Sequence, residues 1–276
     1  TEHFLGISFV RLCAACGRLG GKMRYGLIGE KLGHSYSKII HEKLADYRYD
    51  LIPLNQEEFD KFMTAREFTA INVTIPYKQR VIPYLDELHS TARAVGAVNT
   101  IVNRGGKLTG YNTDFYGFEY MIQKNAIPIN GRTCFILGNG GAAKAVLAVL
   151  KHLQAGEILI VSRTPSKGTI SYEECRLRHS DAKIIVNTTP VGMYPNTNGS
   201  PLDLTPFKNC EAVLDLIYNP LHTKLTLQAK ELGIQSVNGL LMLVAQAKQA
   251  AEYFLAQEFD DAVIEPIYQE LLSGFL

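Results

Sequence analysis

The stretch TCFILGNGGAAKAVLAVLKHL, residues 133–153, restricts the fold of this chain more than any other segment. It is typical of a buried apolar strand followed by a glycine turn and an apolar helix, and Gly138, Gly140 and Ala143 give the spacing GxGxxA. The first glycine permits a tight turn, the second lets the backbone approach a pyrophosphate, and the small third residue lets the helix pack against its strand. The segment therefore predicts a dinucleotide site at a helix N-terminus.

The next predicted strand, EILIVS, indicates which dinucleotide is bound. It ends in Ser162, Arg163 and Thr164, and Lys167 follows closely. A site that prefers NAD usually places an acidic residue here to bind the ribose 2′-hydroxyl. A cation flanked by hydroxyl groups suits a 2′-phosphate instead, so this segment favours NADP(H) as the cofactor. The alternative is that Arg163 is a solvated charge at the end of a strand.

Strands and helices alternate from residue 23 onwards, which predicts an α/β fold with a mostly parallel sheet in the first half and a Rossmann-type dinucleotide-binding half. We expect a tight turn between two strands at residues 103–106. In the first half we expect helices over residues 38–47, in QEEFDKFM, in VIPYLDELHSTARAV and over residues 115–124. The stretch SKGTISYEECRLRHSDAK has no clear amphipathic helix.

Composition narrows the classes of partner. The chain has 276 residues, and its 28 basic against 27 acidic residues leave a formal charge of +1. That balance argues against nucleic acid or an anionic membrane as a partner. Uninterrupted apolar runs are far shorter than the ~18 residues that a membrane-spanning helix needs. We therefore expect a soluble protein.

The cysteines and the N-terminal stretch lead to two further expectations. Cys13 and Cys16 form a lone CxxC without a second pair at zinc-ribbon spacing, so we expect no metal site. The odd number of scattered cysteines, 5, fits a reducing cytoplasm. Residues 1–22 differ from the rest and end in a glycine-rich stretch just before Met23. We expect them to be a non-native or disordered extension.

A set of polar residues stands where the predicted strands of the first half end. Ligands of open α/β sheets bind beyond these strand ends. Hydroxyl and amide groups with one lysine and one aspartate suit a small polyhydroxylated molecule. The alternatives are helix capping for the two serines and the aspartate, backbone contacts for Asn99 and plain solvation for Lys78. The set consists of Ser35, Ser37, Asn72, Thr74, Lys78, Asn99 and Asp114.

The chain from Met23 onwards resembles the shikimate dehydrogenases. The resemblance covers nearly all of residues 23–255 and is carried, in family order, by GLIGEKLGHSYSK, INVTIPYK, GAVNT, GYNTD, GNGGAAKA, SRT, NTTPVGM, DLIYNP and NGLLMLVAQA. It implies reversible reduction of 3-dehydroshikimate to shikimate by NADPH, in chorismate and aromatic amino acid biosynthesis. It also implies a monomer or homodimer.

The resemblance also implies roles for individual residues. Lys78 and Asp114 would form the acid–base pair, and Ser35 and Ser37 would bind the substrate carboxylate. The ring hydroxyls would meet Asn72, Thr74, Asn99, Asp114, Tyr218 and Gln246. The cofactor would contact Gly138, Asn139, Gly140, Gly141, Ala142, Ser162, Arg163, Thr164, Lys167, Thr188 and Gly239.

The implied domain division is a catalytic substrate domain over residues 23–124, completed by C-terminal helices within residues 239–276, and a Rossmann domain over residues 125–238. Two features depart from the family pattern: Ser162 stands where relatives that prefer NADP usually carry asparagine, and the stretch after Arg163 is short. The alternatives are therefore an NAD-preferring quinate/shikimate dehydrogenase and a non-catalytic relative that binds a metabolite and a dinucleotide.

Overall fold

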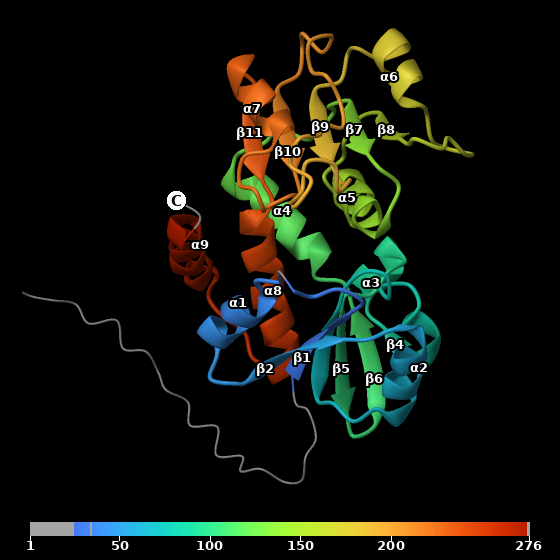
Figure 1. Ribbon diagram of the computed structural model, residues 1–276, viewed down its shortest axis with the longest axis vertical. Helices are drawn as coiled ribbons and strands as arrows, with labels where there is room; N and C mark the ends of the chain where they lie inside the picture. The colour runs from blue at the N-terminus through green and yellow to red at the C-terminus, as the bar shows by residue number, and fades with distance from the viewer. Residues whose placement is uncertain (1–24, 34, 275–276) are drawn as a thin grey trace, which may run out of the picture.

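The computed structural model describes residues 25–33 and 35–274, so the expected extension at residues 1–22 lies outside the described residues. Two sheets form two units, one above the other in Figure 1, and helices α4 and α8 run between them. Within the described chain, no helix combines the length and the apolar character that crossing a membrane requires.

The first unit contains a six-stranded sheet in the order β2-β1-β3-β5-β6-β4. Strand β1 is parallel to β2 and β3, whereas β5 is antiparallel to both β3 and β6. The elements are β1 (Tyr25–Gly29), α1 (Ser37–Leu44), β2 (Tyr49–Pro53), α2 (Gln56–Ala65), β3 (Ala70–Val73), η1 (Ile82–Tyr84), β4 (Glu87–Leu88), α3 (Ser90–Val95), β5 (Thr100–Arg104), β6 (Lys107–Tyr111) and α4 (Asp114–Lys124).

This strand order brings several loops to one edge of the first sheet. The carboxyl ends of β1, β3 and β6 lie there, because β6 reverses the direction of β5. The beginning of β5 lies at the same edge because β5 runs against β3. Residues 35–37, 74–78, 99 and 112–114 therefore meet, although they are far apart in the sequence.

The second unit contains a five-stranded parallel sheet in the order β11-β10-β9-β7-β8. The chain passes from β7 outwards to β8 and then returns to β9 on the other side of β7, which creates a topological switch point between β7 and β9. The elements are β7 (Cys134–Leu137), α5 (Gly141–His152), β8 (Ile158–Val161), α6 (Tyr172–Arg178), β9 (Ile184–Asn187), β10 (Ala212–Asp215), α7 (Lys224–Glu231) and β11 (Gln235–Asn238).

The C-terminal segment returns to the first unit. It forms α8 (Leu240–Leu255), η2 (Asp261–Val263) and α9 (Ile264–Gly274), and α8 packs against α1, α4, β3 and β5. Gly117 makes the α4–α8 contact close: a Cβ atom there would lie 2.7 Å from the carbonyl oxygen of Met242. A larger residue at position 117 would therefore push the two helices apart.

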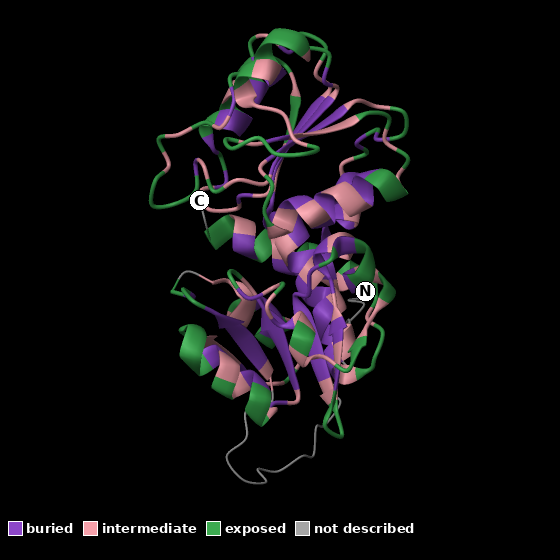
Figure 2. Cartoon of the chain, turned by 90° about the vertical axis from the view of Figure 1, so that its right-hand side faces the viewer, coloured by how far each residue is buried: buried purple, intermediate pink, exposed green. Residues whose placement is uncertain are grey.

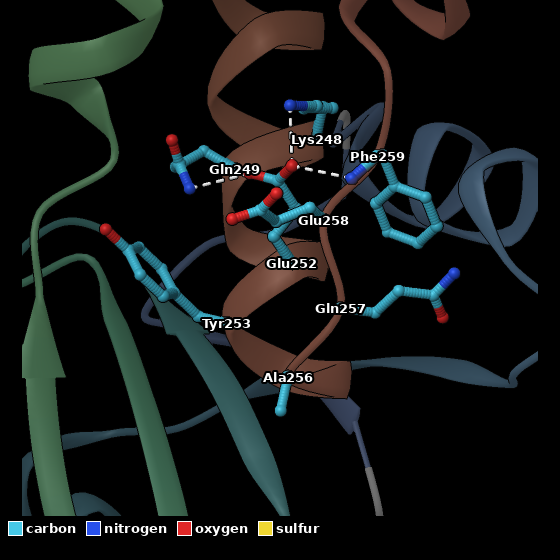
Figure 3. A pocket seen from close by; sticks show the side chains of 8 residues that line it. All are labelled: Lys248, Gln249, Glu252, Tyr253, Ala256, Gln257, Glu258 and Phe259. Atoms are coloured by element: carbon cyan, nitrogen blue, oxygen red, sulfur yellow. Dashed lines mark hydrogen bonds and ion pairs between the residues drawn. The ribbon is translucent and has the colours of Figure 1, made fainter.

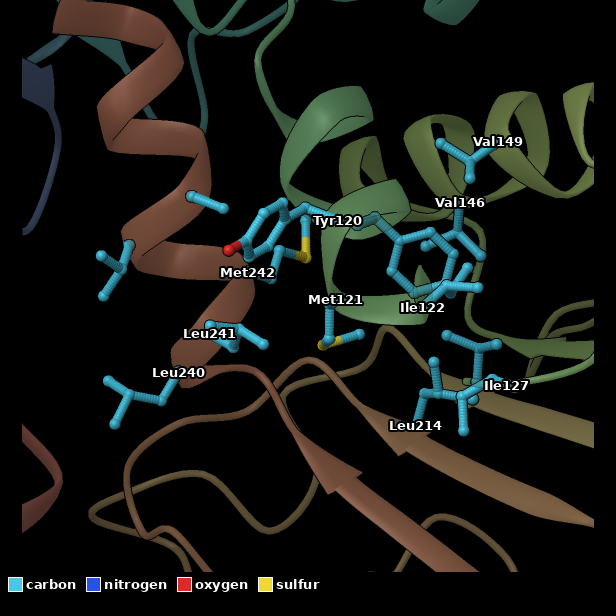
Figure 4. Packing of buried hydrophobic residues seen from close by; sticks show 14 of the residues in the cluster. Tyr120, Met121, Ile122, Ile127, Val146, Val149, Leu214, Leu240, Leu241 and Met242 are labelled. Atoms are coloured by element: carbon cyan, nitrogen blue, oxygen red, sulfur yellow. The ribbon is translucent and has the colours of Figure 1, made fainter. Parts of the chain in front are cut away.

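One buried cluster joins the two units. It takes Phe118 and Met121 from α4, Val146 from α5, Leu214 from β10 and Leu240 from α8. Figure 4 shows several of these side chains packed between the helices and the second sheet. Figure 2 shows buried strands in both sheets and helices that are buried along one side. The relative position of the two units is thus set by apolar packing across α4 and α8.

The helix expected in VIPYLDELHSTARAV was wrong. The segment forms η1, the short strand β4 and the six-residue helix α3 instead. Asp86 and His89 donate their backbone N–H groups to carbonyl oxygens of Leu108 and Gly110 on β6, so the middle of the segment extends the sheet. Pairing with β6 is a long-range interaction that the apolar spacing does not reveal.

Two other expectations were corrected in part. The helix expected over residues 38–47 ends at Leu44, because Ala45 is extended with φ −158°. The stretch after Arg163 contains α6, a helix of seven residues with the side chain of Ser171 as its N-cap and Cys175 as its buried residue. So short a helix with one buried position leaves little amphipathic pattern in the sequence. The tight turn at residues 103–106 is confirmed between β5 and β6.

Candidate active site

An ion pair lies at the edge where the strand ends of the first sheet meet. The Nζ atom of Lys78 donates to Oδ2 of Asp114 over 2.6 Å, and the two side chains are 19% and 11% exposed. The N-cap residue of α4 is Thr113, and Asp114 is the first residue of the helix. The carboxylate of Asp114 therefore pairs with the lysine instead of serving as the N-cap, and the helix N-terminus favours its negative charge.

Asn99 links this pair to the start of β5. Its Nδ2 group donates to Oδ1 of Asp114 and to Oγ1 of Thr113, each over 3.0 Å. Its Oδ1 atom accepts the backbone N–H of Thr113 over 2.8 Å. The sequence left open whether Asn99 serves the backbone or the site, and the structure shows that it contacts both. Its side chain fixes the start of α4 and holds the Asp114 carboxylate in one orientation.

Asn72 extends the polar network along β3. Its Nδ2 group donates to Oγ1 of Thr100 over 3.0 Å and to the carbonyl of Asn99 over 3.2 Å. Thr100 is the residue directly opposite Asn72 in the β3–β5 pairing. On its other side, Oδ1 of Asn72 accepts the hydroxyl of Tyr49 over 2.7 Å. These contacts form a continuous chain of hydrogen bonds from β2 to Lys78.

The serine loop and α8 bring further groups to this edge. Oγ of Ser35 accepts the backbone N–H of Ser37 over 3.3 Å, and neither serine is the N-cap of α1, which is Tyr36. Gln246 on α8 accepts the hydroxyl of Thr113 through Oε1 over 3.2 Å. The half-buried Thr74 follows β3 directly, and its backbone N–H donates to the carbonyl oxygen of Ile28 on β1.

Two tyrosines bring the second unit against the serine loop. The ring of Tyr218, in the loop after β10, packs edge-on against Tyr36 with 5.9 Å between ring centroids. Burial raises the pKa of Tyr218, so its hydroxyl stays protonated across the neutral range. Tyr218 therefore stands beside the residues expected to bind a carboxylate, as a neutral hydrogen-bonding group.

The glycine turn after β7 lies at the switch point of the second sheet. Gly138 has φ +102°, and a Cβ atom there would lie 2.9 Å from Oγ1 of Thr188. This left-handed conformation and the close approach both require glycine. Gly140 is the N-cap of α5, and a Cβ atom there would meet nothing within 4 Å, so the backbone at that point is open. The turn and the N-terminus of α5 thus fit a dinucleotide pyrophosphate.

The glycine turn faces the ion pair. A Cβ atom on Gly141 would lie 3.9 Å from Cδ of Lys78. The N-terminus of α5 in the second unit therefore lies close to the polar edge of the first sheet. A dinucleotide held at α5 would therefore have Lys78 beside it, which suits a reaction between a bound cofactor and a molecule on the first sheet.

A buried carboxylate supports the loops next to the glycine turn. Asp215, at the end of β10, accepts from Nδ2 of Asn187 over 2.9 Å and from the hydroxyl of Thr223 over 2.7 Å. Asn187 in turn accepts both the backbone N–H and the hydroxyl of Thr189. Burial raises the pKa of Asp215 to about 6. The network ties the NTTPVGM loop to the DLIYNP loop that carries Tyr218.

Of the residues expected to contact the adenosine end, Arg163, Thr164 and Lys167 are exposed and Ser162 is half-buried. Arg163 and Lys167 follow β8 on the surface. Ser162 and Thr164 bond to each other, because Oγ of Ser162 accepts the N–H of Thr164 and donates to its carbonyl. This turn leaves the Arg163 guanidinium at the surface beyond the strand end, where a 2′-phosphate would be accessible to it. Asn139 and Ala142 belong to the glycine turn and the first turn of α5.

Gly239 stands at the junction of β11 and α8. A Cβ atom there would lie 2.1 Å from the carbonyl oxygen of Leu216, so the backbone of α8 begins in contact with the loop after β10. Glycine is required at this position for packing, whether or not a cofactor contacts it. Thr188 donates its hydroxyl to the carbonyl of Leu137 over 2.7 Å and so braces the glycine turn.

A pocket near the end of α8 shares none of these residues (Figure 3). Its central carboxylate, Glu252, already pairs with Lys248 over 2.6 Å and accepts from Gln249 and the backbone of Phe259. The Glu252 carboxylate is therefore already engaged within the protein. Across the described part of the chain, no cluster of histidine, cysteine or acidic side chains has the arrangement of a metal site.

Sequence reasoning missed several buried groups that organise the site. Tyr49, Thr100 and Thr113 connect Asn72, Asn99 and Asp114, while Asn187 and Asp215 brace the cofactor side. Thr100 and Thr113 directly follow Asn99 and precede Asp114, so their position beside the predicted residues was a usable signal. The sequence carries no comparable signal for Tyr49, because its contact with Asn72 depends on the order of strands in the sheet.

An α/β protein in which a polar hydrogen-bond network at a sheet edge lies close to a glycine turn of Rossmann type has the architecture of a dinucleotide-dependent oxidoreductase. Comparison with known proteins agrees. The family profile described as the shikimate dehydrogenase substrate binding domain matches residues 27–101. The shikimate dehydrogenase (NADP(+)) of Clostridium perfringens strain SM101 is 40% identical over 269 residues, which span 91% of this chain and 99% of that protein.

Solved structures give the same answer. Shikimate dehydrogenase 1 from Peptoclostridium difficile has 35% identity and a TM-score of 0.85, covering 92% of this chain and 99% of that one. The shikimate 5-dehydrogenase of Thermus thermophilus, solved in complex with NADP(H) and shikimate, has 28% identity and a TM-score of 0.80, covering 90% and 99%. This chain therefore belongs to the shikimate dehydrogenase family.

Proposed function

We propose that this chain catalyses the reversible NADP(H)-dependent reduction of 3-dehydroshikimate to shikimate, with Lys78 and Asp114 as its acid–base pair. The observation that carries the proposal is the Lys78–Asp114 contact of 2.6 Å, placed between a hydroxyl-and-amide network and the N-terminus of α5. The family relationship supports the same substrate and cofactor.

The nicotinamide cofactor, when bound, supplies the hydride that adds to the carbonyl carbon of 3-dehydroshikimate. The residues of this chain then manage one proton. The Lys78 ammonium is well suited to donate a proton to the carbonyl oxygen as it gains negative charge. Asp114 holds the ammonium in place through the 2.6 Å contact. In the reverse direction the lysine accepts the proton of the substrate hydroxyl.

The remaining polar residues orient the substrate in this proposal. Ser35 and Ser37 bind its carboxylate, and Tyr218 helps to contact its ring hydroxyls. Its ring hydroxyls contact Asn72, Thr74, Asn99, Asp114 and Gln246. Amide and hydroxyl groups that are already hydrogen-bonded to one another are held in fixed directions, so little side-chain freedom is lost when the substrate binds.

The cofactor is proposed to bind along the second sheet. The N–H groups at the start of α5, from Asn139 to Ala142, bind the pyrophosphate, and Gly138 and Thr188 shape the turn beneath it. Arg163, flanked by Ser162 and Thr164 and followed by Lys167, binds the 2′-phosphate. Gly239 stands at the nicotinamide end.

We also propose the domain division. Residues 23–124, with the C-terminal helices within residues 239–276, form the substrate domain, and residues 125–238 form the cofactor domain. The packing of α8 against β3 and β5 supports this division. The proposed location is the cytoplasm. The unpaired Cys134 and Cys175 are compatible with its reducing conditions.

The experiment is nicotinamide reduction by the purified protein, with shikimate and quinate each paired with NADP⁺ and NAD⁺. We expect turnover chiefly with shikimate and NADP⁺. A clear preference for NAD⁺ would contradict the role given to Arg163 and leave the substrate site standing. Preference for quinate would contradict the substrate assignment. Absence of turnover in every pairing, from folded protein that still binds NADPH, would contradict the proposal and favour a non-catalytic relative.

A further inference from the structure

Tyr49, at the start of β2, reaches the polar network from the far side of β1. Its side chain is completely buried, so it has no surface to offer to a substrate. Its hydroxyl nevertheless donates to Oδ1 of Asn72 over 2.7 Å. Because β1 lies between β2 and β3, the Tyr49 side chain spans the width of one strand to make this contact. Burial raises the pKa of Tyr49 well above its usual range, so the hydroxyl remains a donor.

The contact gives the Asn72 amide a direction. Its Oδ1 end meets the Tyr49 hydroxyl, and its Nδ2 end donates to Thr100 and to the Asn99 carbonyl. If the hydroxyl is absent, the Oδ1 atom loses this donor in a buried environment. The orientation of the amide depends on distinct partners at its two ends. With no donor at Oδ1, only the bonds of Nδ2 oppose its rotation.

The Tyr49 ring is itself held by stacking on one face. The His41 ring on α1 stacks on it with 4.2 Å between centroids and an 11° interplanar angle, and Phe254 on α8 lies 5.5 Å from His41 at 19°. Burial lowers the pKa of His41 to about 3, so the ring is neutral at neutral pH. Nδ1 of His41 is 2.6 Å from the Tyr47 hydroxyl, which fixes the plane of the ring.

The backbone of Tyr49 is anchored as well. Its N–H donates to Glu42 over 3.1 Å and its carbonyl accepts from Lys38 over 2.8 Å, both on α1. The hydroxyl is therefore presented to Asn72 from a rigid element. Support of this kind keeps a side chain within the narrow range of positions that a binding site requires.

We propose that Tyr49 is a positioning residue for the substrate: its hydroxyl, held by the His41 stack, fixes the orientation in which Asn72 meets a ring hydroxyl. The inference rests on the proposed function, because it takes Asn72 to contact the substrate. Tyr49 acts through Asn72 alone and touches neither the cofactor nor the reacting atoms. Its removal should therefore affect recognition of the substrate and leave the cofactor site and the proton transfer nearly unchanged.

The test is Tyr49→Phe, which keeps the stacked ring and removes the hydroxyl. We expect the KM for shikimate to rise about 5- to 20-fold, as loss of one buried hydrogen bond implies. The kcat should stay within about threefold and the KM for NADP⁺ within about twofold. Tyr77→Phe is the matched control: Tyr77 is also completely buried, but its hydroxyl donates to the carbonyl of Leu54 and not to a site residue. We expect its KM for shikimate to stay within about twofold.

A double-mutant cycle separates positioning from a general structural role. Asn72→Ala should raise the KM for shikimate, and adding Tyr49→Phe should raise it little further, because the hydroxyl then has no amide to orient. Full additivity would overturn the inference. An unchanged KM in Tyr49→Phe, with normal turnover by the unmodified protein, would overturn this inference alone. Absence of shikimate turnover by the unmodified protein would overturn the proposed function with it.

Discussion

The two sides of the proposed site are built in different ways. On the first sheet, the side chain of Asn72 donates to the backbone of Asn99, the side chain of Asn99 donates to Asp114, and Asp114 pairs with Lys78. On the second sheet, the turn from Gly138 to Gly141 offers backbone, and the space above Gly140 is open. A small polyhydroxylated molecule is recognised by the direction of each side-chain group. A pyrophosphate is recognised by N–H groups and by the absence of side chains that would block it.

The comparison implies that the first sheet is sensitive to loss of functional groups and the second to gain of atoms.

The largest expected effect lies in the ion pair. We expect Lys78→Ala and Asp114→Ala each to lower kcat about 100-fold or more, because proton transfer loses its donor or the group that holds it. Steady-state kinetics with shikimate and NADP⁺ measures this. Lys61→Ala removes an exposed pair with Glu57 and serves as the control, with kcat unchanged. Near-normal turnover in either site variant would remove that residue from the mechanism.

The second prediction asks whether the cofactor side also depends on a buried side chain. The folded-state pKa of Asp215 is raised from 3.8 to about 6 by burial, so folding favours its protonated form. Its ionisation therefore lowers stability as pH rises from about 4 through about 6, and the cost is fully present above that range.

Asp215→Asn cannot ionise at this position. Relative to this variant, the unmodified protein should lose roughly 2 kcal/mol of unfolding free energy between about pH 4.5 and pH 7. Urea unfolding followed by circular dichroism at both pH values measures the difference. A difference that does not change with pH would show that Asp215 ionises in the folded protein as it does in the unfolded chain. Burial of Asp215 would then impose no pH-dependent cost on the stability of the cofactor side.

The third prediction compares two glycine-to-alanine substitutions in the second unit, each of which adds one methyl group. Gly140→Ala should raise the Kd for NADPH about 20-fold with little change in Tm, because the methyl group enters the space expected for the pyrophosphate. Gly156→Ala should instead lower the Tm and leave the Kd for NADPH nearly unchanged. A Cβ atom there would lie 2.8 Å from the carbonyl oxygen of Gly131, so the protein should lose stability and the remaining folded fraction should bind NADPH normally. Equal effects of the two variants on NADPH affinity would contradict the role of the open backbone.

The smallest effect is expected at the exposed end of the cofactor site. Arg163→Ala should raise the KM for NADP⁺ about 10-fold and leave the KM for NAD⁺ nearly unchanged, because only NADP⁺ carries the 2′-phosphate. Arg48→Ala, which removes another exposed arginine paired with Asp50, provides the matched control. Parallel losses with both cofactors would mean that Arg163 supports the loop and does not read the phosphate.

Much of the site could be predicted because its key residues stand where strands end. Asn72, Lys78, Asn99 and Asp114 follow or precede apolar segments, and the rule that ligands bind at these ends was sufficient to group them. The groups that hold them could not be predicted in the same way. Tyr49 contacts Asn72 across β1, and Asp215 contacts Asn187 through the pairing of β9 and β10. Such contacts depend on which strands become neighbours.

The helix expected in VIPYLDELHSTARAV was wrong for the same reason. Its apolar spacing is compatible with a helix, but Asp86 and His89 bond to β6, a strand formed by a later part of the chain. The competition between local and long-range hydrogen bonds is decided by the sheet and not by the segment itself.

The sequence by itself determined the chemical groups, the GxGxxA turn and most of the order of strands and helices along the chain. These follow from side-chain type and short-range periodicity, which are properties of neighbouring residues. Only the tertiary structure decided that Lys78 meets Asp114, that Tyr49 orients Asn72 and that α8 returns to the first sheet. Those contacts join residues far apart in the chain, and they form because burial of the shared apolar core brings the strand ends to one edge.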